Sequence, residues 1–189
     1  MVPSAPSAGS PPAPAQRLVD LLQSLGVTHL VTVPDNTSAP ILQVAETEAI
    51  RLLYATREGE AIALASGLWL GGALPAVLIQ NTGFLEAGDA LRGTASRMGA
   101  PLLLLVTCRG YGKARAAGME PGEAEVDRDL LVREDLDSVA FMTEKTLRAW
   151  GTPYLTLVDP SDPSPVGQAF AKALEEGRPW AVLLDASFD

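Results

Sequence analysis

One stretch of the chain decides the fold: REGEAIALASGLWLGG (Arg57–Gly72), which is followed by the apolar segment VLIQNTG (Val77–Gly83). The first run is rich in small and apolar residues and predicts a helix over 58–70. The second is a short apolar run that ends in polar residues and a glycine, as a buried strand does. With the apolar run 51–55 before the helix, this gives the strand–helix–strand unit of an α/β fold. Glu58 therefore falls at a strand-to-helix corner.

The same alternation extends from residue 15 to the end of the chain. Six apolar runs predict strands at 28–33, 51–55, 76–80, 101–107, 154–158 and 180–185. Helical patterns predict helices at 15–24, 39–48, 58–70, 85–98 and 165–176, with one more within 126–150. Because continuously apolar strands are buried on both faces, we expect an α/β fold of three layers, with helices on both sides of a mainly parallel six-stranded sheet. The run 101–107 is the most apolar and is expected near the sheet centre.

The chain divides into a tail and one domain. Residues 1–14 are rich in Pro, Ala and Ser and are expected to form a disordered tail, without the basic start and apolar block of a secretory signal. Residues 15–189 are long enough for one ordinary core. The Gly-rich and charged segment 110–125 is long for a connection in a compact domain, so we expect it to be functional or mobile.

Composition excludes several classes of protein. The formal net charge of −9 argues against nucleic acid as a partner, and no apolar run reaches the roughly 20 residues that a membrane helix needs. The single cysteine, Cys108, rules out an internal disulfide and favours a reducing cytoplasm. Cys108 has no neighbouring base for a nucleophilic role. With one histidine, His29, placed at the start of a strand, no cluster of His or Cys ligands for a metal is expected.

Polar residues follow the predicted strands where a ligand would bind. In an open parallel sheet, ligands bind beyond the carboxyl ends of the strands, because loops and helix N-termini meet there. The residues expected at this rim are 34–36, 56–58, 81–83, 108–110 and 159–161. Polar turns end the strands of every such sheet, so this pattern alone does not distinguish a site from ordinary turns.

Four sequence motifs narrow the choice of protein family. In order along the chain they are GVTH (Gly26–His29), PDN (Pro34–Asn36), REGEA (Arg57–Ala61) and QNTG (Gln80–Gly83). Their order and spacing resemble the pyrimidine-binding (PYR) half of thiamine-diphosphate enzymes, and within these the alpha subunit of sulfopyruvate and phosphonopyruvate decarboxylases. The resemblance covers almost the whole chain after the tail. It implies the PYR-domain fold and the activity of a carboxy-lyase that acts on sulfopyruvate, phosphonopyruvate or a related 2-oxo acid.

By this resemblance, Glu58 is the catalytic residue. In the family, the matching glutamate shares a proton with a ring nitrogen of the cofactor's pyrimidine, which leads to activation of the thiazolium carbon. Read from its position alone, a glutamate in the first turn of a helix also stabilises that helix through the dipole. Glu60 projects elsewhere and is expected to be solvated or structural.

The resemblance also assigns Gln80, Asn81, Thr82 and Gly83 to a loop that passes near the aminopyrimidine of thiamine diphosphate. The residues alone also allow a turn in which Asn81 and Thr82 bond local backbone groups and Gly83 supplies a permissive torsion. The commoner family form continues with a second glycine and an asparagine, whereas this chain has FLEAGD (Phe84–Asp89). The departure bears on the substrate more than on the cofactor.

Residues at two other rim positions are candidates for substrate binding. Asp35 and Asn36 match a loop that borders the substrate in related enzymes, although Asn36 is also placed to cap the next helix. Arg109, Lys113 and Arg115 follow the central strand and could receive a sulfonate, phosphonate or carboxylate. For Lys113 and Arg115, a solvated loop explains the sequence better than a binding role does.

The sequence lacks the family's motif for the charged end of the cofactor. That motif is Gly-Asp-Gly with a downstream asparagine, and the segment GDA (Gly88–Ala90) does not satisfy it. The resemblance therefore implies a separate beta subunit with a diphosphate-binding (PP) domain, which holds Mg²⁺ and the diphosphate. We expect a hetero-oligomer with at least two copies of each chain and no metal site in this one.

Two alternatives remain open at this point. The chain could be a non-catalytic PYR-like module that scaffolds or regulates a partner, an option kept open by the altered segment after Gly83. It could also be a flavodoxin-like domain that binds a small anion by itself.

Overall fold

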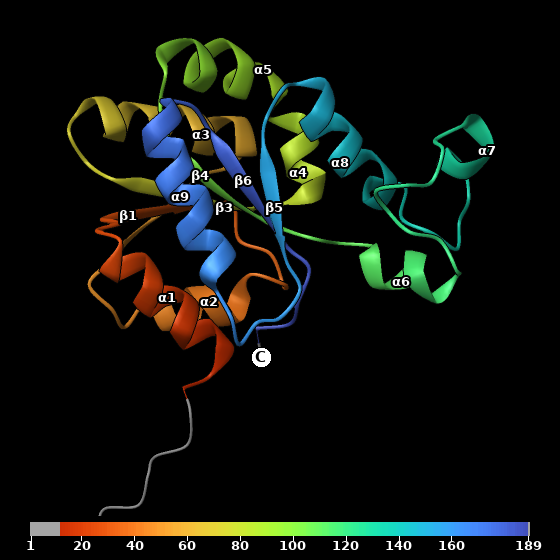
Figure 1. Ribbon diagram of the computed structural model, residues 1–189, viewed down its shortest axis with the longest axis horizontal. Coiled ribbons are helices and arrows are strands. Elements are labelled where there is room, and N and C mark those ends of the chain that lie inside the picture. The colour runs from red at the N-terminus through yellow and green to blue at the C-terminus, as the bar shows by residue number, and fades with distance from the viewer. Residues whose placement is uncertain (1–11, 189) are drawn as a thin grey trace, which may run out of the picture.

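The computed structural model describes residues 12–188, and a six-stranded parallel sheet runs through its middle (Figure 1). The strands are β1 (His29–Thr32), β2 (Arg51–Tyr54), β3 (Pro75–Gln80), β4 (Leu103–Thr107), β5 (Tyr154–Leu157) and β6 (Trp180–Leu184). Their order is β2-β1-β3-β4-β6-β5, and all five pairings are parallel. The predicted α/β architecture is confirmed, and the apolar strand β4 lies inside the sheet as expected.

Helices cover both faces of the sheet and give three layers. One face packs against α1 (Pro14–Ser24), α2 (Ala39–Ala45) and α9 (Ser164–Glu176), which contribute Leu18, Leu22, Ile41 and Phe170 to its core. The other face packs against α3 (Glu58–Leu70), α4 (Asn81–Glu86), α5 (Gly88–Ala90), the π-helical turn η1 (Leu91–Ser96) and α8 (Val139–Ala149). Figure 1 shows α3 and α5 above the strands and α1 and α2 below them.

Most predicted boundaries agree with the structure to within one to three residues. Helix α3 spans 58–70 as predicted, and α8 is followed by Gly151, whose φ of 65° lies in the left-handed region that favours glycine. The predicted helix at 85–98 is wrong at its start, because α4 begins at Asn81. Gln80 is still extended, with ψ of 151°, so the chain passes from β3 into the helix without a loop.

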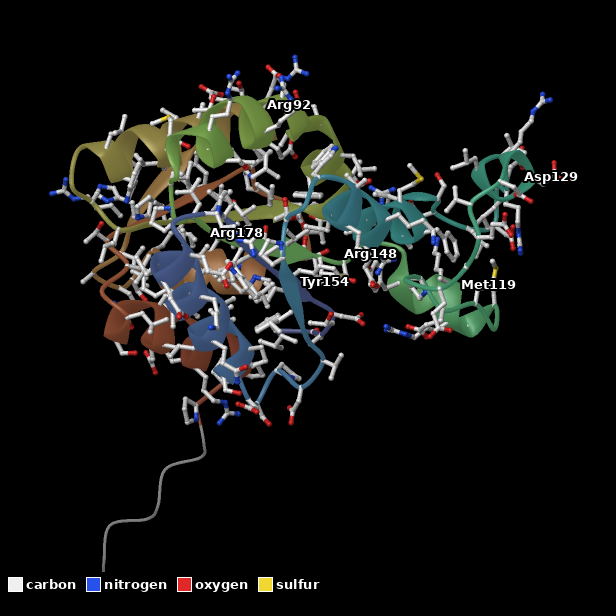
Figure 2. The ribbon with its side chains drawn as sticks, turned by 45° about the horizontal axis from the view of Figure 1, so that its top comes forward. Arg92, Met119, Asp129, Arg148, Tyr154 and Arg178 are labelled. Carbon is white, nitrogen blue, oxygen red and sulfur yellow. The ribbon has the colours of Figure 1, made fainter. Side chains whose placement is uncertain are left out.

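The segment between β4 and α8 leaves the main body. It contains two short helices, α6 (Tyr111–Ala116) and α7 (Arg128–Leu131), which Figures 1 and 2 show projecting beyond the sheet. A small core of its own joins it to α8, with Tyr111, Leu130, Leu136 and Phe141 buried together. The long connection predicted at 110–125 is therefore partly helical.

The tail expected at 1–14 lies outside the described residues up to position 11, and α1 already begins at Pro14. Within residues 12–188, no helix has the length and apolar character that a membrane span requires.

Candidate active site

The residues that the sequence places at the rim lie at one edge of the sheet. The parallel register aligns Thr32 with Leu78, Gln80 with Thr107, and Thr107 with Leu184. The segments that follow these strands therefore begin side by side, as expected for the ligand-binding edge of an open α/β sheet.

Glu58 is the first residue of α3, and its half-buried carboxylate lies against Gly83 in the first turn of α4. A β-carbon at position 83 would overlap the carboxyl carbon and Oε1 of Glu58. Gly83 is not among the glycines with positive φ, so the backbone torsion does not require glycine here. Glycine is needed for space, because the carboxylate of Glu58 occupies the volume that a side chain would take.

Glu60 has a different task from Glu58. Its carboxylate accepts hydrogen bonds from the hydroxyl (2.7 Å) and the backbone N–H (2.8 Å) of Thr56, on the solvent-exposed side of the corner. These bonds lower the pKa of Glu60, with the hydroxyl as the largest cause. Glu60 therefore fixes the turn before α3, in agreement with the structural role expected for it.

Asn81 is fully buried and joins three elements. Its amide nitrogen donates to the carbonyl of Arg109 (3.0 Å) and to Oγ1 of Thr143 (3.1 Å), and its Oδ1 accepts from the N–H of Arg109 (3.1 Å). The side chain thus ties the start of α4 to the end of β4 and to α8.

Gln80 and Thr82 connect this corner to the loop after β1. The side-chain amide of Gln80 donates to Oδ1 of Asp35 (3.3 Å), and the hydroxyl of Thr82 donates to Oε1 of Gln80 (3.2 Å). Thr82 is exposed and Gln80 half-buried, so both can reach a ligand at the rim.

Asp35 keeps one carboxylate oxygen without a partner. Its Oδ1 accepts from the backbone N–H groups of Thr37 (2.6 Å) and Ser38 (3.2 Å). Its Oδ2 is buried and has no hydrogen-bond partner in the described chain. A buried acceptor without a donor is costly, so this oxygen is suited to a donor supplied by a ligand.

Asn36 is exposed, and the expectation that it caps the following helix is wrong. The residue before α2 is Ser38, whose hydroxyl bonds the backbone of Asp35. These bonds satisfy the backbone N–H and carbonyl of Asp35 within the loop, and the side chain of Asn36 faces solvent.

The rim arginines are already paired with carboxylates. Arg109 forms an ion pair with Asp137 (2.6 Å), while Arg115 bonds Asp185 (2.5 Å) and Glu120 (3.1 Å). The hydrogen bond that Arg115 donates to Asp185 is the largest cause of the raised pKa of the Arg115 guanidinium. Arg109 therefore lies at the expected rim position, but its side chain is directed to the segment before α8.

Cys108 is half-buried, and burial raises the pKa of its thiol well above the ordinary value. The carboxylates of Asp185 and Glu144 raise that pKa further. The thiol is therefore protonated at neutral pH, which agrees with the absence of a nucleophilic role in the sequence-based interpretation.

The sequence-based interpretation missed Glu86. This residue bonds the backbone N–H of Gly59 and forms an ion pair with Arg57, on either side of Glu58. Its only signal in the sequence is its place three residues after Gly83, within the segment that departs from the commoner family form.

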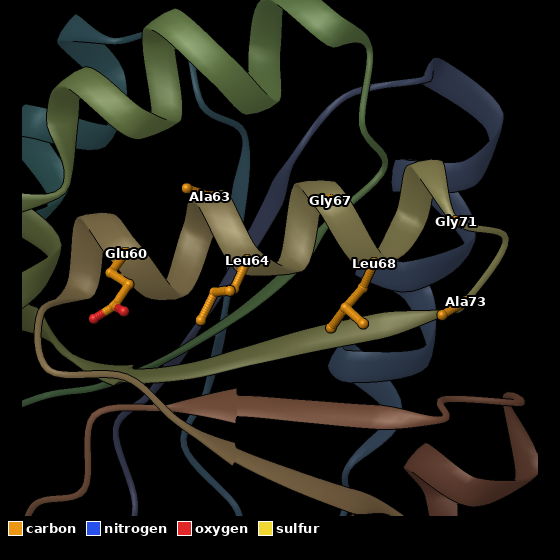
Figure 3. Close-up of a pocket in the computed structure, with 7 residues that line it drawn as sticks. All are labelled: Glu60, Ala63, Leu64, Gly67, Leu68, Gly71 and Ala73. Carbon is orange, nitrogen blue, oxygen red and sulfur yellow. The ribbon is translucent and has the colours of Figure 1, made fainter.

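The outer face of α3 carries an apolar groove. Ala63, Leu64, Gly67, Leu68 and Gly71 line it, and Figure 3 shows it running along the helix from the end at Glu60. Leu64 and Leu70 are 40% and 67% exposed, although most surface helices turn their leucines inward. The helix is thus apolar on both its inner and outer faces.

Comparisons with known proteins agree with this architecture. Residues 14–128 match the family model described as thiamine pyrophosphate enzyme, N-terminal TPP binding domain. A phosphonopyruvate decarboxylase from Streptomyces viridochromogenes is 37% identical over 97 residues, which cover 51% of this chain and 24% of that protein. The chain thus spans about a quarter of the length of this relative.

Other relatives match over most of their length. The alpha subunit of sulfopyruvate decarboxylase from Methanothermobacter thermautotrophicus is 25% identical over 170 residues, covering 88% of this chain and 92% of that subunit. Among solved structures, a thiamine diphosphate-dependent 4-hydroxybenzoylformate decarboxylase from Rhodococcus jostii RHA1 superposes with a TM-score of 0.63 at 19% identity. That superposition covers 94% of this chain and 30% of the other, and it supports the fold.

Proposed function

Because this chain belongs to the thiamine pyrophosphate enzymes, through the N-terminal TPP binding domain at residues 14–128, we propose that it is the alpha (PYR) subunit of a two-chain 2-oxo acid decarboxylase. The similarity to sulfopyruvate decarboxylase alpha subunits along nearly their full length supports the two-chain arrangement. The proposed substrates are sulfopyruvate, phosphonopyruvate or a related acid.

The observation that carries the proposal is the carboxylate of Glu58 held against Gly83 at the rim. The position fits the cofactor's pyrimidine: the carboxylate is half-buried, lies at the ligand-binding edge and forms no ion pair with any residue of 12–188. Bound thiamine diphosphate would supply an electron sink for loss of carbon dioxide. Glu58 would hold a proton between its carboxylate and the pyrimidine nitrogen.

The neighbouring residues of α4 would form the wall of this site. The backbone at Gly83 lies against the carboxylate of Glu58. Gln80 and Thr82 are linked to it through the first turn of α4, where the hydroxyl of Thr82 bonds the side chain of Gln80. Asn81 would support that wall from behind, because its amide already bonds Arg109 and Thr143.

Asp35, Asn36 and Arg109 would border the substrate. The buried Oδ2 of Asp35 accepts no hydrogen bond from the described residues. An N–H or O–H group of the bound cofactor or substrate would donate one to it. Arg109 would receive the acid group of the substrate, and this requires that the acid compete with Asp137 for the guanidinium.

A beta subunit would hold Mg²⁺ and the diphosphate. The groove on α3 begins at Glu60, within one turn of Glu58, so a partner that completes the cofactor site would continue onto this apolar face. Burial of Leu64 and Leu70 by the partner would account for their exposure in the single chain. We propose a hetero-oligomer with at least two copies of each chain.

The test is reconstitution with a candidate beta subunit that carries the diphosphate-binding (PP) domain. The mixed complex should release carbon dioxide from sulfopyruvate or phosphonopyruvate only when thiamine diphosphate and Mg²⁺ are present. A stable complex that turns over neither acid, and whose assembly ignores the cofactor, would instead identify a non-catalytic scaffolding or regulatory subunit. The ion pair of Arg109 with Asp137 favours this non-catalytic function, because Asp137 already neutralises the guanidinium that would bind the substrate's acid group.

A further inference from the structure

Glu86 holds the chain on both sides of Glu58. Its Oε2 accepts a hydrogen bond from the backbone N–H of Gly59 (3.0 Å), and its Oε1 forms an ion pair with the guanidinium of Arg57 (2.6 Å). Residues 57 and 59 flank Glu58 directly, so one side chain of α4 contacts both neighbours of the proposed catalytic residue.

The hydrogen bond to Gly59 satisfies a group that α3 cannot satisfy itself. The first N–H groups of a helix have no acceptor within the helix, and a side chain at the N-cap commonly supplies one. Here the N-cap residue is Arg57, which makes no side-chain cap. Glu86 therefore caps α3 from another helix.

Gly83 and Glu86 act on the same short segment. They lie three residues apart on α4, the spacing that places two residues on one face of a helix. Gly83 provides the space for the carboxylate of Glu58, while Glu86 fixes the backbone from which Glu58 extends. Together the two residues determine where that carboxylate lies.

We infer that Glu86 is a positioning residue that acts through Glu58. The inference rests on the proposed function and names a residue in the segment where this chain departs from the commoner family form. The ion pair contributes little, because the side chains of Arg57 and Glu86 are 71% and 36% exposed. The bond to the N–H of Gly59 carries the effect.

The experiment compares three variants in the reconstituted complex: Glu86→Ala, Glu86→Gln and Asp89→Ala. Alanine removes the acceptor for Gly59, and a displacement of Glu58 on the order of 1 Å should lower kcat roughly ten- to a hundredfold. Glutamine keeps an acceptor oxygen and should restore kcat to within about threefold of the unmodified complex. Asp89→Ala is the matched control, since it removes an exposed ion pair with Arg92 on the same helical run.

A double-variant cycle separates positioning from general stability. In the Glu58→Gln background, Glu86→Ala should cost less than about twofold more in kcat, because there is no catalytic carboxylate left to misplace. If Glu86→Ala lowers kcat by the same factor in both backgrounds, or if glutamine is as damaging as alanine, the inference is wrong.

A second readout needs no activity and tests the inference even if the proposed function fails. The proposed function fails when the unmodified complex shows no cofactor-dependent decarboxylation. Amide hydrogen exchange of Gly59, measured by NMR on the full chain, reports the cap itself. Exchange should accelerate at least about tenfold in Glu86→Ala and stay near its original rate in Glu86→Gln and Asp89→Ala. Equal exchange rates in all variants would overturn the inference.

Discussion

The carboxylate of Glu58 occupies the volume that a β-carbon on residue 83 would need. This contact links the start of α3 to the start of α4 and determines where the proposed catalytic acid lies at the rim of the sheet. The proposed role of Gly83 in cofactor binding is thus tied to space for Glu58.

Gly83→Ala should displace Glu58 and lower kcat of the reconstituted complex by about a hundredfold, since small misplacements of catalytic groups have effects of that order. Gly167→Ala in α9 is the matched control, because its β-carbon would meet nothing within 4 Å. That control should raise the free energy of unfolding by about 0.5 to 1 kcal/mol and leave kcat unchanged. Full activity in Gly83→Ala would show that the contact does not position Glu58.

Asn81→Ala should destabilise the fold by about 2 to 3 kcal/mol, because it leaves the backbone N–H and carbonyl of Arg109 without the partners that Asn81 supplies and removes its hydrogen bond to Thr143. Asn36→Ala, at an exposed position, should change stability by less than about 0.5 kcal/mol. Urea denaturation followed by circular dichroism measures both. Equal midpoints for the two variants would contradict the bridging role of Asn81.

Glu60→Gln should flatten the loss of stability in acid. Hydrogen bonds from Thr56 hold the pKa of Glu60 below its ordinary value of 4.5. A carboxyl group with a depressed folded-state pKa stabilises the fold above its unfolded-state pKa, and this contribution disappears as the pH falls through the folded-state pKa. Urea midpoints measured from neutral pH to below this window should therefore fall further in the unmodified chain than in Glu60→Gln. Parallel pH profiles would count against the bond to Thr56.

The sequence alone was enough for the sheet and for most helix boundaries. The strands are continuous apolar runs between polar turns, and Gly151 marks the end of α8 through its left-handed torsion. These signals are local, so they can be read without knowing the tertiary structure. Helix α3 is equally clear, because its small and apolar residues start directly after the extended Arg57.

Contacts between segments that lie far apart in the sequence could not be predicted. Asp137 pairs with Arg109 from 28 positions away, and Glu86 reaches Gly59 across 27 positions, with no periodic pattern that relates the partners. The early start of α4 was missed for a related reason. Its first turn contains Gly83, whose space is filled by Glu58 of another helix, and this packing outweighs the low helix propensity of glycine.

The most direct test of the central claim is the rate of carbon dioxide release by the complex of this chain with the proposed diphosphate-binding subunit, measured for the unmodified chain and for Glu58→Gln. Glutamine keeps the size of the side chain but cannot share a proton as a carboxyl group does. We expect Glu58→Gln to lower kcat at least about a hundredfold while the complex still assembles. A rate within a few-fold of the unmodified complex would contradict the assignment of Glu58.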